Sequence, residues 1–247
     1  MMKTLRVKIL MVVCAAAFIS ACSTVERNSN TPEGAFAIAE EFEKSDRFEE
    51  AIRRYNDVKN KFPYSNYATK AEMAVADVYF KQESFAEAQV AYQSFRDLHP
   101  KHSQIDYVTY RIAQSYSMQL PSTIDRDLTL ASDAITTYTE LIQKFPNSQY
   151  IEEAKTKRAE SLKMLAQKEE YIADFYFKHK NYDSALKRYE GLFGNFTNSG
   201  LEAKALSRAV ICAKRVGNDE KVKKYSAVLF KNYNDSPEAA AARKEIR

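Results

Sequence analysis

The stretches FEEAIRRYNDVKNKFP (residues 48–63) and FAEAQVAYQSFRDLHP (residues 85–100) carry the same pattern 37 positions apart. Each begins with phenylalanine, continues with an alanine and, four positions later, a tyrosine, and ends in proline. An alanine and a tyrosine four positions apart lie on one face of a helix, and a proline stops the helix. A fixed spacing of this length indicates an architecture of stacked repeats.

The repeat continues along most of the chain. A preceding helix in each unit repeats as Ala39, Ala76 and Ala113, again 37 apart. The third unit has nine additional residues between its helices, and the fourth and fifth units continue with Ala185 and Val222. The spacing resembles the second helix of the tetratricopeptide repeat, whose units stack into a superhelix with the first helices lining a concave face. We therefore predict an all-α, tetratricopeptide-repeat solenoid of about five helical hairpins.

The pattern also predicts how the chain is organised. Residues 31–146 hold the N-terminal repeats 1–3, and residues 147–247 hold a long connecting helix and the C-terminal repeats 4–5. Thr31 followed by Pro32 and Glu33 is typical of a helix start. Residues 149–179 contain neither glycine nor proline, which favours one helix of about 45 Å.

The N-terminus has the three parts of a secretory signal: basic residues, an apolar run, and small residues before a cysteine. Its ending, ISAC, resembles the lipobox of bacterial lipoproteins, in which the cysteine is lipidated and the signal is cut before it. Residues 1–21 are then a lipoprotein signal peptide, Cys22 is the lipid attachment site, and residues 22–30 are a lipidated tether. Ser23 after the cysteine favours the outer membrane. An ordinary signal peptide with an incidental cysteine is the alternative.

Composition disfavours several classes of function. Without residues 1–21, which carry three basic residues, 37 − 3 = 34 basic residues face 33 acidic ones, so no strongly basic surface is expected and nucleic-acid binding is disfavoured. The sequence has no glycine-rich phosphate loop, and the HPKH motif (residues 99–102) lacks the further ligands of a metal site. We expect no enzyme activity, no cofactor and no metal. Cys212 is expected to be a small packing residue.

A binding groove is the functional site that the repeats favour. If the first helices face inward, equivalent positions of three units carry Phe36, Met73 and Tyr110, and the same side holds Asp77, Phe80 and Tyr107. Such a row could accept an extended or helical peptide. The alternative is that these side chains pack between repeats.

Four segments make the resemblance more specific. They are HPKHSQIDYVTYRIA (residues 99–113), DRD (residues 125–127), FPNSQY (residues 145–150) and KRYEG (residues 187–191). With the lipobox, the five repeats and the long helix, the whole chain resembles the BamD (YfiO/ComL) family of outer-membrane lipoproteins. The third-repeat insertion is shorter than in better-known members, and Thr197 stands where a closing proline is expected.

The resemblance implies a scaffold subunit of the outer-membrane β-barrel assembly (BAM) complex, lipid-anchored in the outer membrane and facing the periplasm. It implies BamA, through its POTRA domains, as a partner, together with other BAM lipoproteins and unfolded outer-membrane proteins. The family's R-x-E-G element matches Arg188 and Glu190, which are the implied BamA contacts. A lipidated scaffold for another envelope system, such as secretin or pilus assembly or peptidoglycan-linked machinery, is the alternative.

Overall fold

The computed structural model describes residues 28–246, and these residues form helices joined by short turns, with no strand among them. The chain divides into two compact units, residues 1–74 and residues 75–247, which are described separately. The predicted all-α solenoid of about five helical hairpins is confirmed: five helical hairpins follow one another in the described chain, and a further helix ends it.

The first unit contains the first hairpin and the start of the next helix. Its elements are α2 (Pro32–Lys44), α3 (Phe48–Lys61) and the first part of α4 (Asn66–Lys81). The predicted start of α2 is confirmed, since the Thr31 hydroxyl accepts a hydrogen bond from the Gly34 N–H at 3.1 Å. Tyr55 is buried on α3, and its hydroxyl donates to Glu43 at 2.6 Å. This bond joins the two helices of the hairpin.

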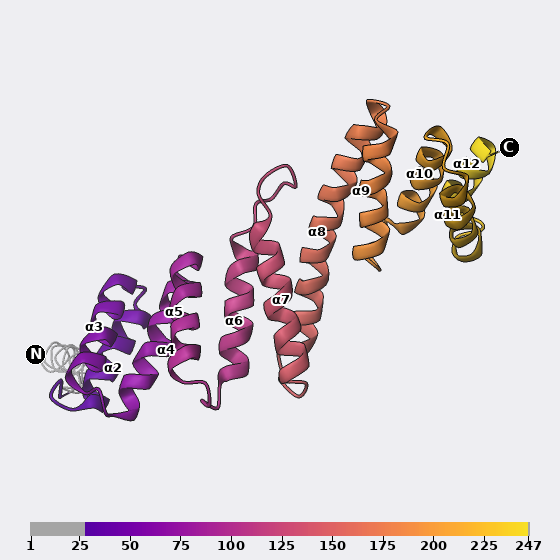
Figure 1. The fold of residues 1–247 in the computed structure, drawn as a ribbon. Helices are drawn as coiled ribbons and strands as arrows, with labels where there is room; N and C mark the ends of the chain where they lie inside the picture. The colour runs from indigo at the N-terminus through magenta and orange to yellow at the C-terminus, as the bar shows by residue number, and fades with distance from the viewer. Residues whose placement is uncertain (1–27, 247) are drawn as a thin grey trace, which may run out of the picture. The chain divides into compact units, whose positions relative to one another are not determined.

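The second unit starts within α4 and runs to the end of the described chain. Its remaining helices are α5 (Phe85–Leu98), α6 (Ile105–Met118), α7 (Thr129–Lys144), α8 (Ile151–Lys178), α9 (Tyr182–Asn195), α10 (Glu202–Arg215), α11 (Asp219–Asn232) and α12 (Pro237–Ile246). From α5 to α11, helices consecutive in the sequence pack side by side (Figure 1). This unit is therefore built as a solenoid, in which each hairpin contacts the hairpins next to it in the sequence.

The core is built from the repeated alanines and tyrosines. Ala88, Ala134 and Ala185 are fully buried, and so are the tyrosines four positions after them, Tyr92, Tyr138 and Tyr189. The small residue lets the neighbouring helix approach, and the tyrosine ring fills the space beside it. The repeated alanine and tyrosine, four positions apart, therefore mark the core face of the second helices.

The turn inside most hairpins repeats as well. Asp46, Glu83, Lys180 and Gly217 all have positive φ, from 56° to 74°. Asp46 and Glu83 lie 37 positions apart, as do Lys180 and Gly217. Only glycine adopts this region without a steric penalty, so the packed helices must hold the other three residues in it. The third hairpin has its longer connection at this place, between α6 and α7, as the inserted residues predicted.

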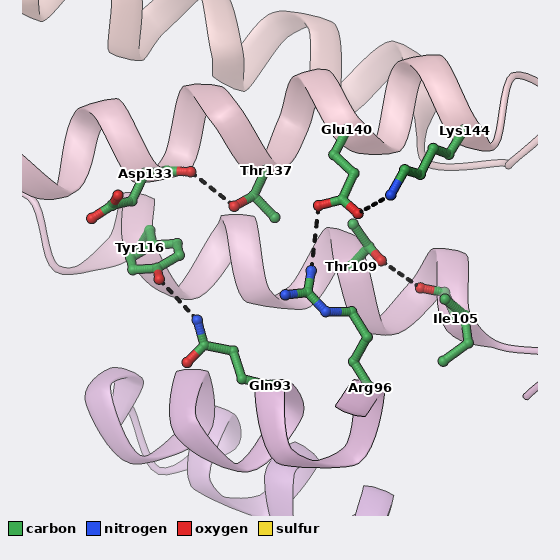
Figure 2. Close-up of polar contacts among 9 residues, drawn as sticks. All are labelled: Gln93, Arg96, Ile105, Thr109, Tyr116, Asp133, Thr137, Glu140 and Lys144. Carbon is green, nitrogen blue, oxygen red and sulfur yellow. Dashed lines mark hydrogen bonds and ion pairs between the residues drawn. The ribbon is translucent and has the colours of Figure 1, made fainter. Parts of the chain in front are cut away.

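Polar contacts tie α5 to both helices of the third hairpin. Figure 2 shows the Arg96 side chain of α5 extending past α6 to Glu140 of α7, with Nη1 and Oε2 3.4 Å apart. Lys144 joins the same carboxylate at 2.8 Å. Gln93 donates to the Tyr116 hydroxyl of α6 at 2.9 Å. These contacts join the second hairpin to the third.

The predicted long helix is confirmed as α8, whose 28 residues give about 42 Å at 1.5 Å per residue. Helix α7 packs on its first half and α9 on its second half. Cys212 on α10 is fully buried in the cluster that surrounds the second half, and burial raises the pKa of its thiol to about 12. This agrees with the packing role expected for it.

Candidate functional site

Three of the predicted groove residues meet where α4, α5 and α6 come together. The Asp77 carboxylate of α4 accepts hydrogen bonds from the Tyr92 hydroxyl of α5 and the Tyr107 hydroxyl of α6, both at 2.5 Å. The Arg111 guanidinium lies 3.7 Å from the ring centre of Phe80, and its Nε lies 3.1 Å from the Tyr107 hydroxyl. We call this cluster of Asp77, Phe80, Tyr92, Tyr107 and Arg111 the first acid junction.

The first acid junction uses its polar groups internally. Burial and the neighbouring Asp77 carboxylate raise the pKa of Tyr107 to about 12 and raise the pKa of Tyr92 further. Both hydroxyls therefore remain protonated donors at neutral pH. Because Asp77 already accepts two short hydrogen bonds, this part of the surface offers a ligand mainly the faces and edges of rings.

Tyr110, also predicted to line the groove, packs between helices. It is 4% exposed, and its ring stacks on Tyr150 with centroids 4.7 Å apart and an interplanar angle of 11°. Burial and the nearby Glu153 carboxylate raise the pKa of the Tyr110 hydroxyl above its usual value. Tyr110 thus takes the position that the packing alternative described.

The other two predicted groove residues belong to the first unit. Phe36 of α2 is half-buried between Tyr55 and Tyr67, with ring centroids at 5.2 and 5.5 Å. Met73 of α4 is also half-buried. An aromatic cluster with a partly open face therefore lies within the first unit itself.

Sequence reasoning missed a second acid junction, in which α8, α9 and α10 meet. The Asp174 carboxylate of α8 accepts from the Tyr189 hydroxyl at 2.5 Å and from the Lys204 ammonium at 2.9 Å. The Arg208 guanidinium lies 4.3 Å from the ring centre of Phe177. The spacing could have shown it, because both acids stand 15 positions before their tyrosine and 30 positions before their second donor.

Electrostatics differ between the two junctions because lysine replaces Tyr107. Burial alone would raise the pKa of Asp174, but hydrogen bonds from Tyr189 and Lys204 lower it below its usual value. Burial opposes the charge of Lys204, yet the Glu170 and Asp174 carboxylates raise its pKa. The second junction is therefore a partly buried ion pair with a buried tyrosine beside it.

The two residues of the R-x-E-G element point to different partners. Arg188 of α9 pairs with Glu169 of α8 at 3.1 Å, and its side chain is 46% exposed. Glu190 accepts from the Tyr225 hydroxyl at 2.6 Å and from Lys221 at 2.7 Å, both on α11. Arg188 is thus available on the surface, while Glu190 ties the fourth hairpin to the fifth.

A second feature that sequence reasoning missed is a pair of exposed aromatic rings on α8. Tyr171 is 60% exposed and Phe175 is 52% exposed. They lie one turn apart, beside a hollow of about 600 Å³ that also borders the α6–α7 connection and Lys204. The sequence signal that could have indicated this surface is the pair of aromatic residues one helical turn apart on the predicted long helix.

The lipid attachment predicted at Cys22 and the signal peptide lie outside the described residues, as does most of the tether. Among residues 28–246, no helix has both the length and the apolarity needed to cross a membrane. The same residues hold no group of three side chains suited to a metal ion.

Solved structures that match this chain include YrrB and PilW. YrrB, a tetratricopeptide protein with an unusual peptide-binding site, matches with a TM-score of 0.39 and 16% identity over 89% of this chain and 95% of that chain. PilW, a type IV pilus biogenesis factor, matches with a TM-score of 0.39 and 14% identity over 86% of this chain and 98% of that chain.

Sequence relatives are more informative. The outer membrane protein assembly factor BamD of Neisseria meningitidis serogroup A is 27% identical over 93% of this chain and 92% of its own length. BamD of Rickettsia prowazekii is 30% identical over 77% of this chain and 75% of its own length. The family model YfiO, described as outer membrane lipoprotein, matches residues 28–229. The chain therefore belongs to the YfiO family of outer-membrane lipoproteins and is a BamD-type assembly factor of the bacterial outer membrane.

Proposed function

We propose that this chain is a lipid-anchored scaffold subunit that holds BamA and unfolded outer-membrane proteins at the periplasmic face of the outer membrane. Acyl chains on Cys22 would supply the anchor, because each buried methylene contributes about 0.8 kcal/mol. Tethering raises the local concentration of both partners, so modest affinities suffice. The scaffold acts by binding, without bond chemistry.

The exposed guanidinium of Arg188 is the observation that carries the proposed contact with BamA. Its bonds to Glu169 run through Nη1, at 3.1 and 3.3 Å. A guanidinium has five N–H donors in a fixed fork, so its outer edge can still bind a carboxylate or carbonyl of a POTRA domain. Glu190 supports this contact indirectly, by holding α9 against α11.

The aromatic cluster around Phe36 in the first unit is the proposed receptor for unfolded substrate. Phe36 and Tyr67 are half-buried and offer apolar contact to an extended segment, and Phe80 and Tyr107, with Asp77 beside them, offer a second aromatic surface in the second unit. Because Tyr110 is buried, its replacement would disturb packing as well as binding. Phe36→Ser, compared with Tyr64→Ser at a fully exposed position, is therefore the sharper test of substrate capture.

The first experiment is purification of the full-length, lipidated chain from membranes in mild detergent, followed by mass spectrometry of its partners. We expect a stoichiometric barrel protein with POTRA domains, and we expect Arg188→Glu to remove most of it. Lys187→Glu is the matched control, since Lys187 is 71% exposed on the same helix and pairs with Asp183.

Equal loss of the barrel protein in Arg188→Glu and Lys187→Glu would contradict the specific contact and leave only a general charge effect. Recovery of a different envelope complex from the unmodified chain would contradict the assembly role itself. That result would favour the scaffold of another envelope system, with the solenoid and the anchor unchanged.

A further inference from the structure

The exposure of Phe175 is an exception to the repeat. Two positions after Ala76 in α4, Ala113 in α6 and Val210 in α10, the chain has Val78, Ser115 and Cys212, and all three are fully buried. The equivalent residue of α8 is Phe175, two positions after the buried Ala173, and it is 52% exposed. A position that is buried in α4, α6 and α10 therefore carries a large, solvent-exposed aromatic ring in α8.

The length of α8 explains the exposure. Helices α6 and α10, in which this position is buried, each pack along the second helix of the preceding hairpin, which is α5 for α6 and α9 for α10. Helix α7 has this role for α8, but it covers only the first half, where Ile151 and Ala154 share a cluster with Tyr138 and Leu141. Past the N-terminal end of α7, this face of α8 is bordered by the α6–α7 connection, in which the Arg126 carbonyl accepts a hydrogen bond from Lys168 at 2.5 Å. Helices α9 and α10 pack against another side of the last three turns of α8, but the face that carries Phe175 has no covering helix in the described chain.

A single face of α8 forms the floor of the hollow. Its residues recur at helical spacing, and the α6–α7 connection and α10 form the sides. The lining residues on α8 are Gln167, Glu170, Tyr171, Asp174, Phe175 and Lys178. About 600 Å³ of space lies above them, which is enough for the buried side chains of two or three helical turns.

Charge in the hollow is unbalanced at one end. Glu170 and Asp174 both accept from Lys204, at 2.6 and 2.9 Å, so these carboxylates are compensated. Lys178 is exposed and makes no ion pair within residues 28–246. An occupant that carries a carboxylate near Lys178 would complete the charge balance.

The first repeat carries a charged residue at the position that corresponds to Phe175. In α2, the first helix of the described chain, the equivalent position is Glu41, which is exposed and charged. A position that faces water at the end of a repeat array is suited by such a residue. Phe175 has the opposite character, and Tyr171 one turn earlier extends the same apolar surface.

We propose that this face of α8 binds an amphipathic helix of a partner protein. The bound helix would take the place that the second helix of the preceding hairpin takes beside α6 and α10. The occupant has aromatic or aliphatic residues one turn apart against Tyr171 and Phe175, and an acidic residue against Lys178. The site differs from the Arg188 contact, because Glu169, the partner of Arg188, is not among the residues that line the hollow. It is an additional docking surface and does not depend on the proposed contact with BamA.

The test uses a helix of the required kind taken from this chain. A stapled, fluorescent peptide copying α5 presents Ala88, Tyr92 and Phe95 on one face and carries Glu87 and Asp97. Fluorescence anisotropy with the full chain should give saturable binding with a Kd below about 200 μM. Phe175→Ser, which introduces the residue found at this position in α6, should weaken binding about tenfold, and Lys178→Glu about threefold.

Leu98→Ser is the matched control, since Leu98 is 65% exposed on α5 and away from the hollow. Each variant should keep the helicity and urea midpoint of the original chain. Absence of binding, or equal binding by Phe175→Ser, overturns the proposal. Equal binding by an unstapled peptide with a central proline would assign the face to an extended segment instead. Sedimentation showing a dimer that Phe175→Ser abolishes would assign it to a second copy of the chain, and both results also overturn the proposal.

Discussion

Removing the Tyr92 hydroxyl tests whether the acid junctions hold neighbouring hairpins together. Tyr92→Phe keeps the fully buried ring and deletes the hydroxyl, which donates to Asp77 and accepts a longer hydrogen bond from Arg111 Nε at 3.3 Å. A hydrogen bond to a charged group contributes about 1.5–3 kcal/mol, and Tyr107 remains to satisfy the carboxylate, so we expect a loss of about 2 kcal/mol. Because each hairpin of a solenoid contacts only its neighbours, the loss should be local.

Native-state hydrogen exchange measures such a local loss. A decrease of 2 kcal/mol should accelerate exchange of the protected amides in α5 and α6 about 30-fold, while α10 and α11 stay unchanged. Tyr189→Phe is the matched control, because it deletes the equivalent donor to Asp174 in the second junction. It should accelerate α9 and α10 and leave α5 and α6 unchanged.

Two results would refute this reasoning. Acceleration of less than about threefold in α5 and α6 would mean that the hydroxyl contributes little beyond the packing of its ring. Equal acceleration along the whole chain in both variants would mean that the solenoid unfolds as one cooperative body, so that the junctions cannot be weakened separately.

Two further predictions concern titratable side chains of the second unit. The Cys212 thiol should react with a thiol reagent only in denaturant, because it is fully buried and its pKa is raised to about 12; rapid modification of the folded chain would contradict this. The pKa of Asp174 is lowered in the folded state, so its contribution to stability should be present above its unfolded pKa of about 3.9 and should disappear as the pH falls through the folded pKa. Asp174→Asn should therefore lower the urea midpoint at pH 7 and have a smaller effect near pH 3, and an equal effect at both values would contradict the ionic role.

The sequence predicted the core better than it predicted the contacts of the core. The repeat spacing identified Tyr55, Tyr92, Tyr138 and Tyr189, and each of them is at most 1% exposed. Their hydrogen-bond partners were not predictable in the same way. Tyr55 donates to an acid 12 positions away and Tyr92 to one 15 positions away, whereas Tyr138 accepts from a serine 21 positions away. These distances depend on the length of each connection and on which turn of the facing helix carries a polar residue.

The candidate site was predictable only in part, for a related reason. Repeat positions grouped Asp77, Phe80 and Tyr107 on one side, but they could not show that Asp77 would accept hydrogen bonds from two tyrosine hydroxyls. Nor could they show that Phe175 would be exposed, since that depends on where α7 begins relative to α8. Spacing within one helix can be deduced from the sequence, whereas the extent to which one helix covers another requires the folded chain.

The continuous helix α8 has a consequence for how the second unit could be re-engineered. Because one unbroken helix carries both α7 and α9, its number of residues sets the rotational phase between the third and fourth hairpins. One residue inserted near the exposed Lys163 would turn the following hairpins by about 100° and move them about 1.5 Å. Seven inserted residues would restore the orientation to within about 20° while adding about 10 Å. The length of α8 thus sets both the distance and the rotation between the third and fourth hairpins. Insertions of graded length would separate functions that depend on the distance between these hairpins from functions that depend on their relative orientation.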